Sequence, residues 1–364
     1  MPKILEYKCP CCGGAISFES DIQKMKCPYC DTEFDVETLK AYDQDLASAS
    51  EKDRMEWENP GKVWQEGDEQ GMRLYVCNSC GGQILGDATL GATFCPYCGN
   101  PVIMSGQFAG DLMPDLIIPF KLDKETAKKQ LLEHYKKMPF LPKEFTEGNH
   151  IDEIRGLYVP FWLFNTTAHG KVHYKATKIR TWTDTRFVYT DTSFFSVTRE
   201  GNLRFNGIPA DGSSKMPDDI TQSIEPFDFS EAVDFQTAYM SGYLADRYDV
   251  EFKDCIPYIN ERVKNSVIET FQGTVQGFNT VNIEDSFVST QNGAVRYAMC
   301  PVWILNTTWK DRKYIFAMNG QTGKMVGNTP IDKKKVWLKG ILYAFIAAAA
   351  VLAAEIFLHM LGIF

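Results

Sequence analysis

Eight of the eleven cysteines stand in four C-x2-C pairs, and these pairs form two sets in which fourteen residues separate one pair from the next. The first set is Cys9, Cys12, Cys27 and Cys30, and the second is Cys77, Cys80, Cys95 and Cys98. Four thiolates at tetrahedral geometry suit zinc, and an all-cysteine set fills every coordination position, as in structural sites. The spacing therefore predicts two structural Zn²⁺ ions. It argues against a catalytic zinc, which keeps one position for water.

The two sets belong to two copies of one short module. The copies share Gly13-Gly14 with Gly81-Gly82, Cys27-Pro-Tyr-Cys30 with Cys95-Pro-Tyr-Cys98, and Ile16 with Ile84. Residues 1–40 and 71–106 are predicted to be two small β zinc ribbons, in which each cysteine pair caps a β-hairpin. A module of about thirty residues has too small an apolar core to fold alone. Metal binding, worth roughly 10–16 kcal/mol in zinc peptides, supplies the missing free energy.

Two other interpretations of the cysteines stay open, a redox-active dithiol pair and an iron or iron–sulfur site. Cys11 aligns with Ser79 of the second copy and is predicted to be a bystander, with a locally swapped ligand as the alternative. Cys255 and Cys300 are single and are expected to be buried thiols. Paired cysteines in a chain that opens without an apolar export signal indicate a reducing compartment, the cytoplasm.

The balance of charge weighs against nucleic acid as a partner. The 364 residues carry a net charge of −9, and residues 1–40 hold seven acidic and five basic side chains. A protein that binds DNA or RNA displaces counterions with a basic surface, and neither ribbon has one.

Between the ribbons, residues 41–70 are predicted to be a solvated acidic linker, with a docking motif around Trp57 and Trp64 as the alternative. Residues 110–330 are predicted to form an α+β body. Its expected helices span 124–138, with Asp123 as N-cap, and about 255–271.

Strands are expected elsewhere in the body, notably Val172–Tyr189 and Tyr314–Val326. The sequence Pro160-Phe-Trp-Leu-Phe-Asn-Thr-Thr167 recurs as Pro301-Val-Trp-Ile-Leu-Asn-Thr-Thr308, each expected to be a strand that opens after proline. This echo predicts two related lobes, about 110–215 and 225–330, with Trp162 and Trp303 in equivalent core positions.

Residues 338–364 are predicted to be a transmembrane tail anchor. The stretch from residue 340 onward is long enough at 1.5 Å per residue to cross a hydrocarbon core of about 30 Å. Lys333, Lys334, Lys335 and Lys339 precede it, so the positive-inside rule keeps the bulk of the chain in the cytoplasm. Glu355 and His359 share one helix face and are expected to reach water at the outer interface, with a membrane partner as the alternative. An apolar helix docked on the body is the alternative to insertion.

One further motif is set aside. Asn319-Gly-Gln-Thr-Gly-Lys324 resembles a phosphate-binding loop only superficially, because Met325 follows the lysine. Asn-Gly between two strand-like runs predicts a hairpin turn.

The layout resembles the YdjG-like, TFIIB-type zinc-ribbon membrane proteins of Gram-positive bacteria, over nearly the whole chain. The residues that carry the resemblance are the two ribbons, Tyr158-Val-Pro-Phe-Trp162, Pro301-Val-Trp303, and Asn319-Gly-Gln-Thr-Gly-Lys324 with Gly327 and Pro330. Such proteins often carry names borrowed from the primosomal helicase, whose motifs this chain lacks. The resemblance implies association with PspA-like coiled-coil proteins and SPFH/flotillin-like scaffolds at the membrane.

These observations predict a non-enzymatic, membrane-anchored adaptor that presents zinc ribbons and an α+β body to protein partners. A nucleic-acid-binding zinc-ribbon protein and a membrane-proximal enzyme with a site between the lobes are the alternatives. The sequence offers no assembled catalytic residues for the enzyme alternative.

Overall fold

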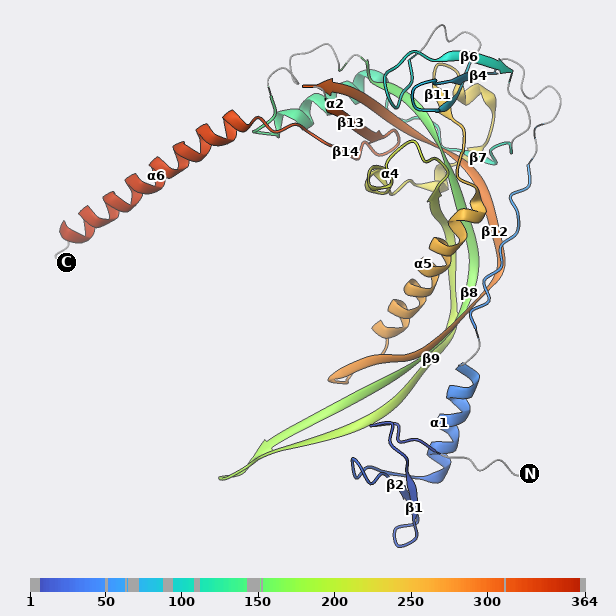
Figure 1. Cartoon of the computed structure of the whole chain (residues 1–364), viewed down its shortest axis with the longest axis vertical. Helices are drawn as coiled ribbons and strands as arrows, with labels where there is room; N and C mark the ends of the chain where they lie inside the picture. The colour runs from blue at the N-terminus through green and yellow to red at the C-terminus, as the bar shows by residue number, and fades with distance from the viewer. Residues whose placement is uncertain are drawn as a thin grey trace. The chain divides into compact units, whose positions relative to one another are not determined.

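The computed structural model describes residues 7–49, 52–62, 64, 72–87, 94–107, 112–142, 151, 153–310 and 312–360. The fold is α+β, with most of the regular structure in sheet. The chain divides into two compact units, each built from three segments. Unit 1 is Met1–Asn59, Leu163–Ile208 and Lys253–Val295, and unit 2 is Pro60–Trp162, Pro209–Phe252 and Arg296–Phe364. The long strands β8 (Arg155–Thr183), β9 (Val188–Asp211) and β12 (Thr280–Trp309) contribute residues to both units (Figure 1).

Unit 1 begins with a three-stranded antiparallel sheet of β1 (Ser17–Glu19), β2 (Lys24–Lys26) and β3 (Glu33–Phe34), followed by α1 (Val36–Ala49). The helix predicted over 255–271 is confirmed as α5 (Phe252–Gly273). Its buried face contains Ile259, Val263 and Val267, at the expected steps of three and four residues. Gly170 of β8 allows the helix to approach closely, because a Cβ atom there would lie 2.4 Å from Val267.

The segment predicted as a solvated linker is partly ordered against unit 1. Its first part is the C-terminal half of α1, and Arg54 and Glu58 form isolated parallel bridges with β12. Trp57 packs edge-on against Phe164 at 5.0 Å between ring centroids, and its Nε1 donates to Asn260 Oδ1 at 2.9 Å. Burial of an apolar ring against other side chains is favourable relative to its exposure to water. The contacts of Trp57 therefore hold this part of the segment on unit 1.

Unit 2 holds the remaining elements. They are β4 (Met72–Val76), β5 (Gln83–Asp87), β6 (Ile103–Gln107), β7 (Leu116–Ile117), α2 (Lys124–Lys136), α4 (Asp218–Ile224), β10 (Val233–Asp234), β11 (Leu244–Asp246), β13 (Arg312–Asn319), β14 (Met325–Gly327) and α6 (Lys333–Met360), with short 3-10 turns at Phe229–Glu231 and Thr237–Met240. Among the described residues, the large sheet has the strand order β10-β7-β12-β8-β11-β5-β4-β6, with β9 on β8 and β13 and β14 beyond β12.

The N-terminus predicted for α2 is confirmed, since Asp123 caps it by accepting from Thr126 N at 2.7 Å. This contact also lowers the pKa of the Asp123 carboxyl. Leu131 and Tyr135 lie in the core, whereas Leu132 is 36% exposed. Leu132 lies on the exposed side of α2, because each step of one residue along a helix turns the side chain by about 100°.

The contacts around the two echoing segments match each other within unit 2. The short strand β11 runs parallel to β8, and β7 runs parallel to β12. Trp162 and Trp303 are both buried. Trp162 Nε1 donates to Val250 O and Trp303 Nε1 to Leu122 O, in each case a carbonyl two residues before a helix. Each tryptophan thus fastens the beginning of one helix to a long strand.

The backbone around the echoing prolines repeats in the same way. Gly212 N donates to Pro160 O at 3.0 Å, and Gly320 N donates to Pro301 O at 2.8 Å. Both prolines lie inside long strands, so the prediction that each segment opens a strand was wrong. The carbonyl of each proline still accepts a hydrogen bond. Proline has no backbone N–H group, so each strand loses only that one donor from its hydrogen-bond ladder.

The strand predicted over Val172–Tyr189 contains a reversal. β8 ends at Thr183 and β9 begins at Val188, and Asp184 N donates to Phe187 O at 3.0 Å. The Asp184 carboxylate accepts from the backbone N–H groups of Arg186 and Phe187. Aspartate often closes turns in this way, but no glycine or proline marks the turn in the sequence.

Helix α6 is long and apolar enough to cross a membrane over Lys333–Ala354, and no part of its apolar window is buried against the described residues. Its beginning is fixed to the body. Lys335 Nζ donates to Leu141 O at 2.6 Å, and Lys339 Nζ lies 5.2 Å from the Phe140 ring centroid. The side chains of Glu355 and His359, and residues 361–364, lie outside what the structure describes.

Candidate metal centres

The structure brings the eight predicted cysteines together in two groups of four. In each group the sulfur atoms all lie within 4.8 Å of one another. The sulfur atoms of Cys9 and Cys30 lie 3.6 Å apart and those of Cys12 and Cys27 3.5 Å apart in the first group, and in the second Cys77–Cys98 are 3.4 Å and Cys80–Cys95 3.6 Å apart. A tetrahedron with metal–sulfur bonds of about 2.3 Å has edges of about 3.8 Å, whereas a disulfide needs about 2.05 Å. Both groups could therefore hold a metal ion.

All four C-x2-C turns have the same backbone geometry. The first cysteine of each turn accepts from the residue four positions on, as Cys9 O does from Gly13 N at 2.8 Å and Cys77 O from Gly81 N at 2.8 Å. That residue has positive φ in every turn, +75° at Gly13 and +56° at Asp31, for example. Aspartate tolerates this region less well than glycine does. The second turn of the first group therefore differs from the other three turns, which have glycine at this position.

The two groups contain thiols of unequal acidity. Burial raises the pKa of Cys9 and of Cys95. The Thr32 hydroxyl and backbone N–H lower the pKa of Cys30 to about 6. Burial opposes ionisation of Cys77, but the backbone N–H groups of Cys80 and Ser79 lower its pKa to about 7. Since the thiolate is the form that binds a metal ion, the lowered pKa values of Cys30 and Cys77 favour binding of a cation at both groups.

Cys11, Cys255 and Cys300 lie outside both groups. Burial raises the pKa of Cys11, whose backbone carbonyl accepts from Lys175 Nζ at 2.8 Å. Cys255 and Cys300 are buried thiols, as expected.

The two groups differ in their surroundings. The first belongs to the small sheet of β1, β2 and β3. In the second, β5 pairs antiparallel with β11 through Leu85–Ala245 and Ile84–Asp246, so its strands extend the large sheet of unit 2. The tyrosine of the shared Cys-Pro-Tyr-Cys sequence differs in exposure between the two groups: Tyr29 is 75% exposed and Tyr97 is 7% exposed.

A buried polar cluster lies beneath the second group. Asp246 is fully buried, and its Oδ2 accepts from Ser213 Oγ, while Oδ1 has no hydrogen-bond partner among the described residues. Tyr97 lies next to this carboxyl group and is also buried. Burial raises the pKa of Asp246 to about 7, against the opposing effect of the Ser213 hydrogen bond. Nothing in the sequence distinguished Asp246 from a surface aspartate.

Replacement of Asp246 by asparagine is expected to change how stability depends on pH. An ordinary aspartate has a pKa of 3.8, so between about pH 4 and pH 7 the unfolded chain has lost a proton that the folded chain keeps. The wild type therefore loses stability as pH rises through this window, by up to about 1.4 kcal/mol per pH unit. Asp246→Asn lacks this loss.

The measurement is thermal unfolding of wild type and Asp246→Asn at pH 5 and pH 8. Metal binding depends on pH in the same way in both proteins. Its contribution therefore cancels when the stability of one protein is subtracted from that of the other. The stability of the variant relative to the wild type should be greater at pH 8 than at pH 5. An equal difference at the two pH values would show that Asp246 keeps its ordinary pKa.

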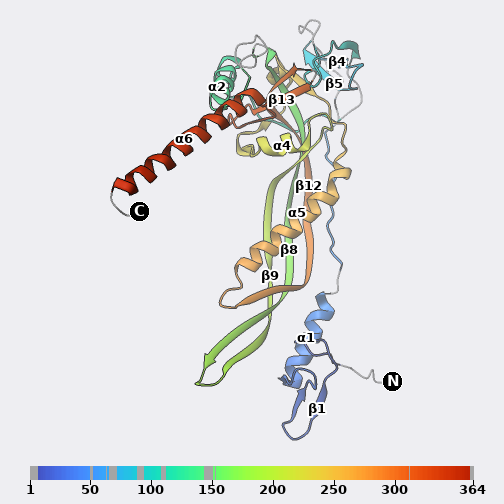
Figure 2. The ribbon, with the colours of Figure 1, turned by 60° about the vertical axis from the view of Figure 1, so that its left-hand side comes forward.

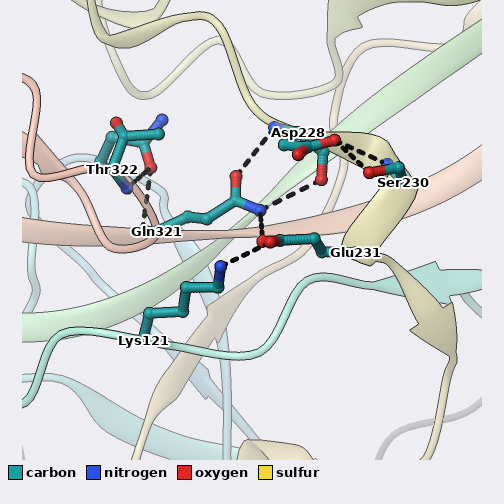
Figure 3. Close-up of polar contacts among 7 residues, drawn as sticks. Lys121, Asp228, Ser230, Glu231, Gln321 and Thr322 are labelled. Atoms are coloured by element: carbon teal, nitrogen blue, oxygen red, sulfur yellow. Dashed lines mark hydrogen bonds and ion pairs between the residues drawn. The ribbon is translucent and has the colours of Figure 1, made fainter.

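The predicted hairpin turn at 319–324 is confirmed, since β13 pairs antiparallel with β14. Figure 3 shows that Gln321 is held by the facing segment: its Oε1 accepts from Asp228 N at 2.8 Å, and its Nε2 donates to Asp228 O at 3.1 Å and to Glu231. Lys121 Nζ contacts the other oxygen of Glu231 at 2.6 Å. Asn319 Nδ2 donates to the carbonyls of Ile224 and Pro226. These contacts tie the turn to its own unit.

A cavity of about 570 Å³ lies in unit 2. Lys124, Glu153 and Arg155 contribute its charged side chains, beside Tyr243 and Trp303. Arg155 is engaged elsewhere, because its guanidinium donates to Phe94 O at 3.1 Å and lies 5.6 Å from the Phe94 ring centroid.

Fold and sites together define an α+β protein with two four-cysteine centres that could hold metal ions and one helix able to span a membrane. The chain is 31% identical over 361 residues to the uncharacterized protein YdjG of Bacillus subtilis strain 168, with 99% of each chain covered. It therefore belongs to the YdjG family. No protein-family model matches it, and no solved structure matches it.

Proposed function

We propose that this chain is a membrane-anchored, zinc-binding adaptor. Zn²⁺ would occupy both groups of cysteines, because four sulfur ligands close the coordination sphere of a structural site. There the ion would supply a rigid cross-link between two turns. Helix α6 would anchor the chain as a single-pass tail in the cell membrane. The lysines at its N-terminal end would leave the bulk of the chain in the cytoplasm.

The observation that carries the adaptor role is the exposure of the first ribbon, residues 7–34. Tyr29 is 75% exposed, Phe18 51% and Ile22 40%. The equivalent tyrosine of the second ribbon is covered by its own unit, since Tyr97 is 7% exposed. Exposed aromatic side chains on a small rigid surface are typical anchors of protein interfaces. We propose that the second ribbon stabilises unit 2 and that the first ribbon binds the partner.

Resemblance of the sequence to its family suggests the class of partner, a PspA-like coiled-coil protein or an SPFH/flotillin-like scaffold. We also propose that the body consists of two related lobes. The matching contacts of Trp162 with Val250 and of Trp303 with Leu122 support this proposal. In this arrangement the tryptophan of each lobe donates a hydrogen bond to the residue that lies two positions before the helix of the other lobe.

The test is co-purification of the full-length protein from native membranes, with the bound proteins identified by mass spectrometry. Phe18→Ser/Tyr29→Ser should lose the partner while it keeps the zinc content and membrane location of the wild type. An interface anchor contributes about 2 kcal/mol or more, or roughly thirty-fold in affinity. Leu132→Ser, on the exposed side of α2, is the matched control and should keep the partner. Equal recovery of partners with the double variant would contradict the proposal.

A further inference from the structure

The β8–β9 hairpin ends in a long exposed tip. Every residue from 178 to 196 is exposed, and we call this segment the hairpin tip. Figures 1 and 2 show the paired ends of β8 and β9 extending past the end of α5 and past β12 of the same unit. An exposed two-stranded hairpin has little stability of its own, so a segment that projects this far is expected to have a use.

The hairpin tip is apolar on both of its faces. Trp182 and Tyr189 stack across the two strands at 5.6 Å between centroids. Val188, next to Tyr189, points to the opposite face, because neighbouring side chains of a strand alternate. Val188 is 69% exposed and Phe187 in the turn 63%. A protein partner that binds a sheet ordinarily covers one face, whereas both faces of this tip carry apolar side chains.

Cations accompany these aromatic rings. Arg180 lies 5.7 Å from the Trp182 ring centroid, and Lys178 lies 5.5 Å from that of Phe195. Arg186 adds a third positive charge in the turn, and with the two acids of the tip, Asp184 and Asp191, the net charge of the tip is +1. The Asp184 carboxylate is directed inward, since it accepts from two backbone N–H groups and from Tyr189 Oη at 2.9 Å, and these bonds hold its pKa below the ordinary value.

We propose that the hairpin tip inserts into the interfacial region of a bilayer that contains anionic lipids. Tryptophan and tyrosine suit the boundary between headgroups and acyl chains, since each combines an apolar ring with a polar atom. Arginine and lysine beside them match anionic headgroups. A bilayer would also surround both faces of the hairpin.

The inference rests on the proposed anchoring by α6. That helix would hold the chain at the lipid surface and so raise the effective concentration of lipid around the tip. A membrane contact that is weak on its own is reinforced when another part of the same chain is anchored in the same membrane.

Quenching of tryptophan emission by brominated lipids tests the insertion in the full-length protein. The protein is reconstituted into vesicles of phosphatidylcholine and phosphatidylglycerol, with and without bromine on the acyl chains. The difference between wild type and Trp182→Phe isolates the emission of Trp182 from that of the other six tryptophans, which include the exposed Trp337 of α6. Trp182 should be quenched by the brominated lipids.

Phe187→Glu/Val188→Glu keeps Trp182 but places two carboxylates at the end of the hairpin tip. Its Trp182 emission should return to the level measured without bromine. Tyr258→Glu, at a 48% exposed position of α5, is the matched control and should leave the quenching unchanged. In vesicles of phosphatidylcholine alone the quenching should weaken, and equal quenching there would overturn the role of anionic headgroups.

Flotation with the vesicles separates this inference from the proposed function. A chain that does not float contradicts anchoring by α6. A chain that floats but leaves Trp182 unquenched overturns insertion of the hairpin tip, and that is also the result expected if the tip binds a protein.

Discussion

Cys77→Ser/Cys95→Ser is expected to unfold much of unit 2, well beyond the second ribbon. The double variant keeps two of the four sulfur ligands and should bind one metal ion per chain in place of two. Structural zinc contributes roughly 10–16 kcal/mol in small peptides, which is comparable to the roughly 5–15 kcal/mol unfolding free energy of a whole domain. Because β5 pairs with β11, and β11 with β8, loss of the ribbon removes a neighbour from the sheet. It also uncovers the buried Asp246.

Hydrogen exchange checks this expectation segment by segment. Protection should fall in β4 and β5 of the ribbon, and also in β11, which lies outside the ribbon sequence. The matched control is Cys9→Ser/Cys27→Ser, which removes the same number of ligands from the first group. That variant should also lose one metal ion, but its loss of protection should stay within residues 7–34, since those strands form a separate small sheet. Loss confined to the ribbon in both variants would show that unit 2 is stable without the second site.

Local signals in the sequence were sufficient to predict the cysteine groups and the two helices. Ligand spacing fixes which sulfurs can share an ion. The capping aspartate before α2 and the repeat of apolar residues along α5 are features of a few successive turns. Such features depend on neighbours in the chain, so they are visible without knowledge of the fold.

Pairing of β5 with β11 was not predictable in this way. Leu244–Asp246 is a short strand far from the ribbon in sequence, and its partner is decided by the packing of the whole sheet. For the same reason the two ribbons looked alike in sequence although one is covered and the other is exposed. Burial raises the pKa of Asp246, and that burial depends on parts of the chain distant in sequence, so the residues next to Asp246 did not indicate the shift.

The hairpin turn after β8 was missed for a different reason. Residues 172–189 are rich in β-branched and aromatic side chains, which predict a strand without a break. The turn depends on one side chain, because Asp184 accepts from the backbone of Arg186 and Phe187. A single aspartate among strand formers is too weak a signal to divide a strand by inspection.

Ala347→Lys/Ala350→Lys is expected to move the protein from the membrane fraction to the soluble fraction. The twelve Leu, Ile, Val and Phe residues from 340 onward favour insertion by roughly 4–7 kcal/mol. Two lysines near the middle of the span cost about 5–7 kcal/mol together, which cancels that preference. Carbonate extraction followed by immunoblotting of both fractions measures the change.

Ala347→Leu/Ala350→Leu is the control for this change, because it alters the same two positions and makes the span more apolar. It should stay in the membrane fraction. Both variants should keep the fold of unit 2, since α6 is joined to the body at its beginning, through Lys335 and Leu141, and its apolar window buries nothing against the described residues. A lysine variant that still resists extraction would mean that another part of the chain binds the membrane strongly enough without α6. The hairpin tip would then be the first segment to examine, since its aromatic and basic side chains are exposed in unit 1.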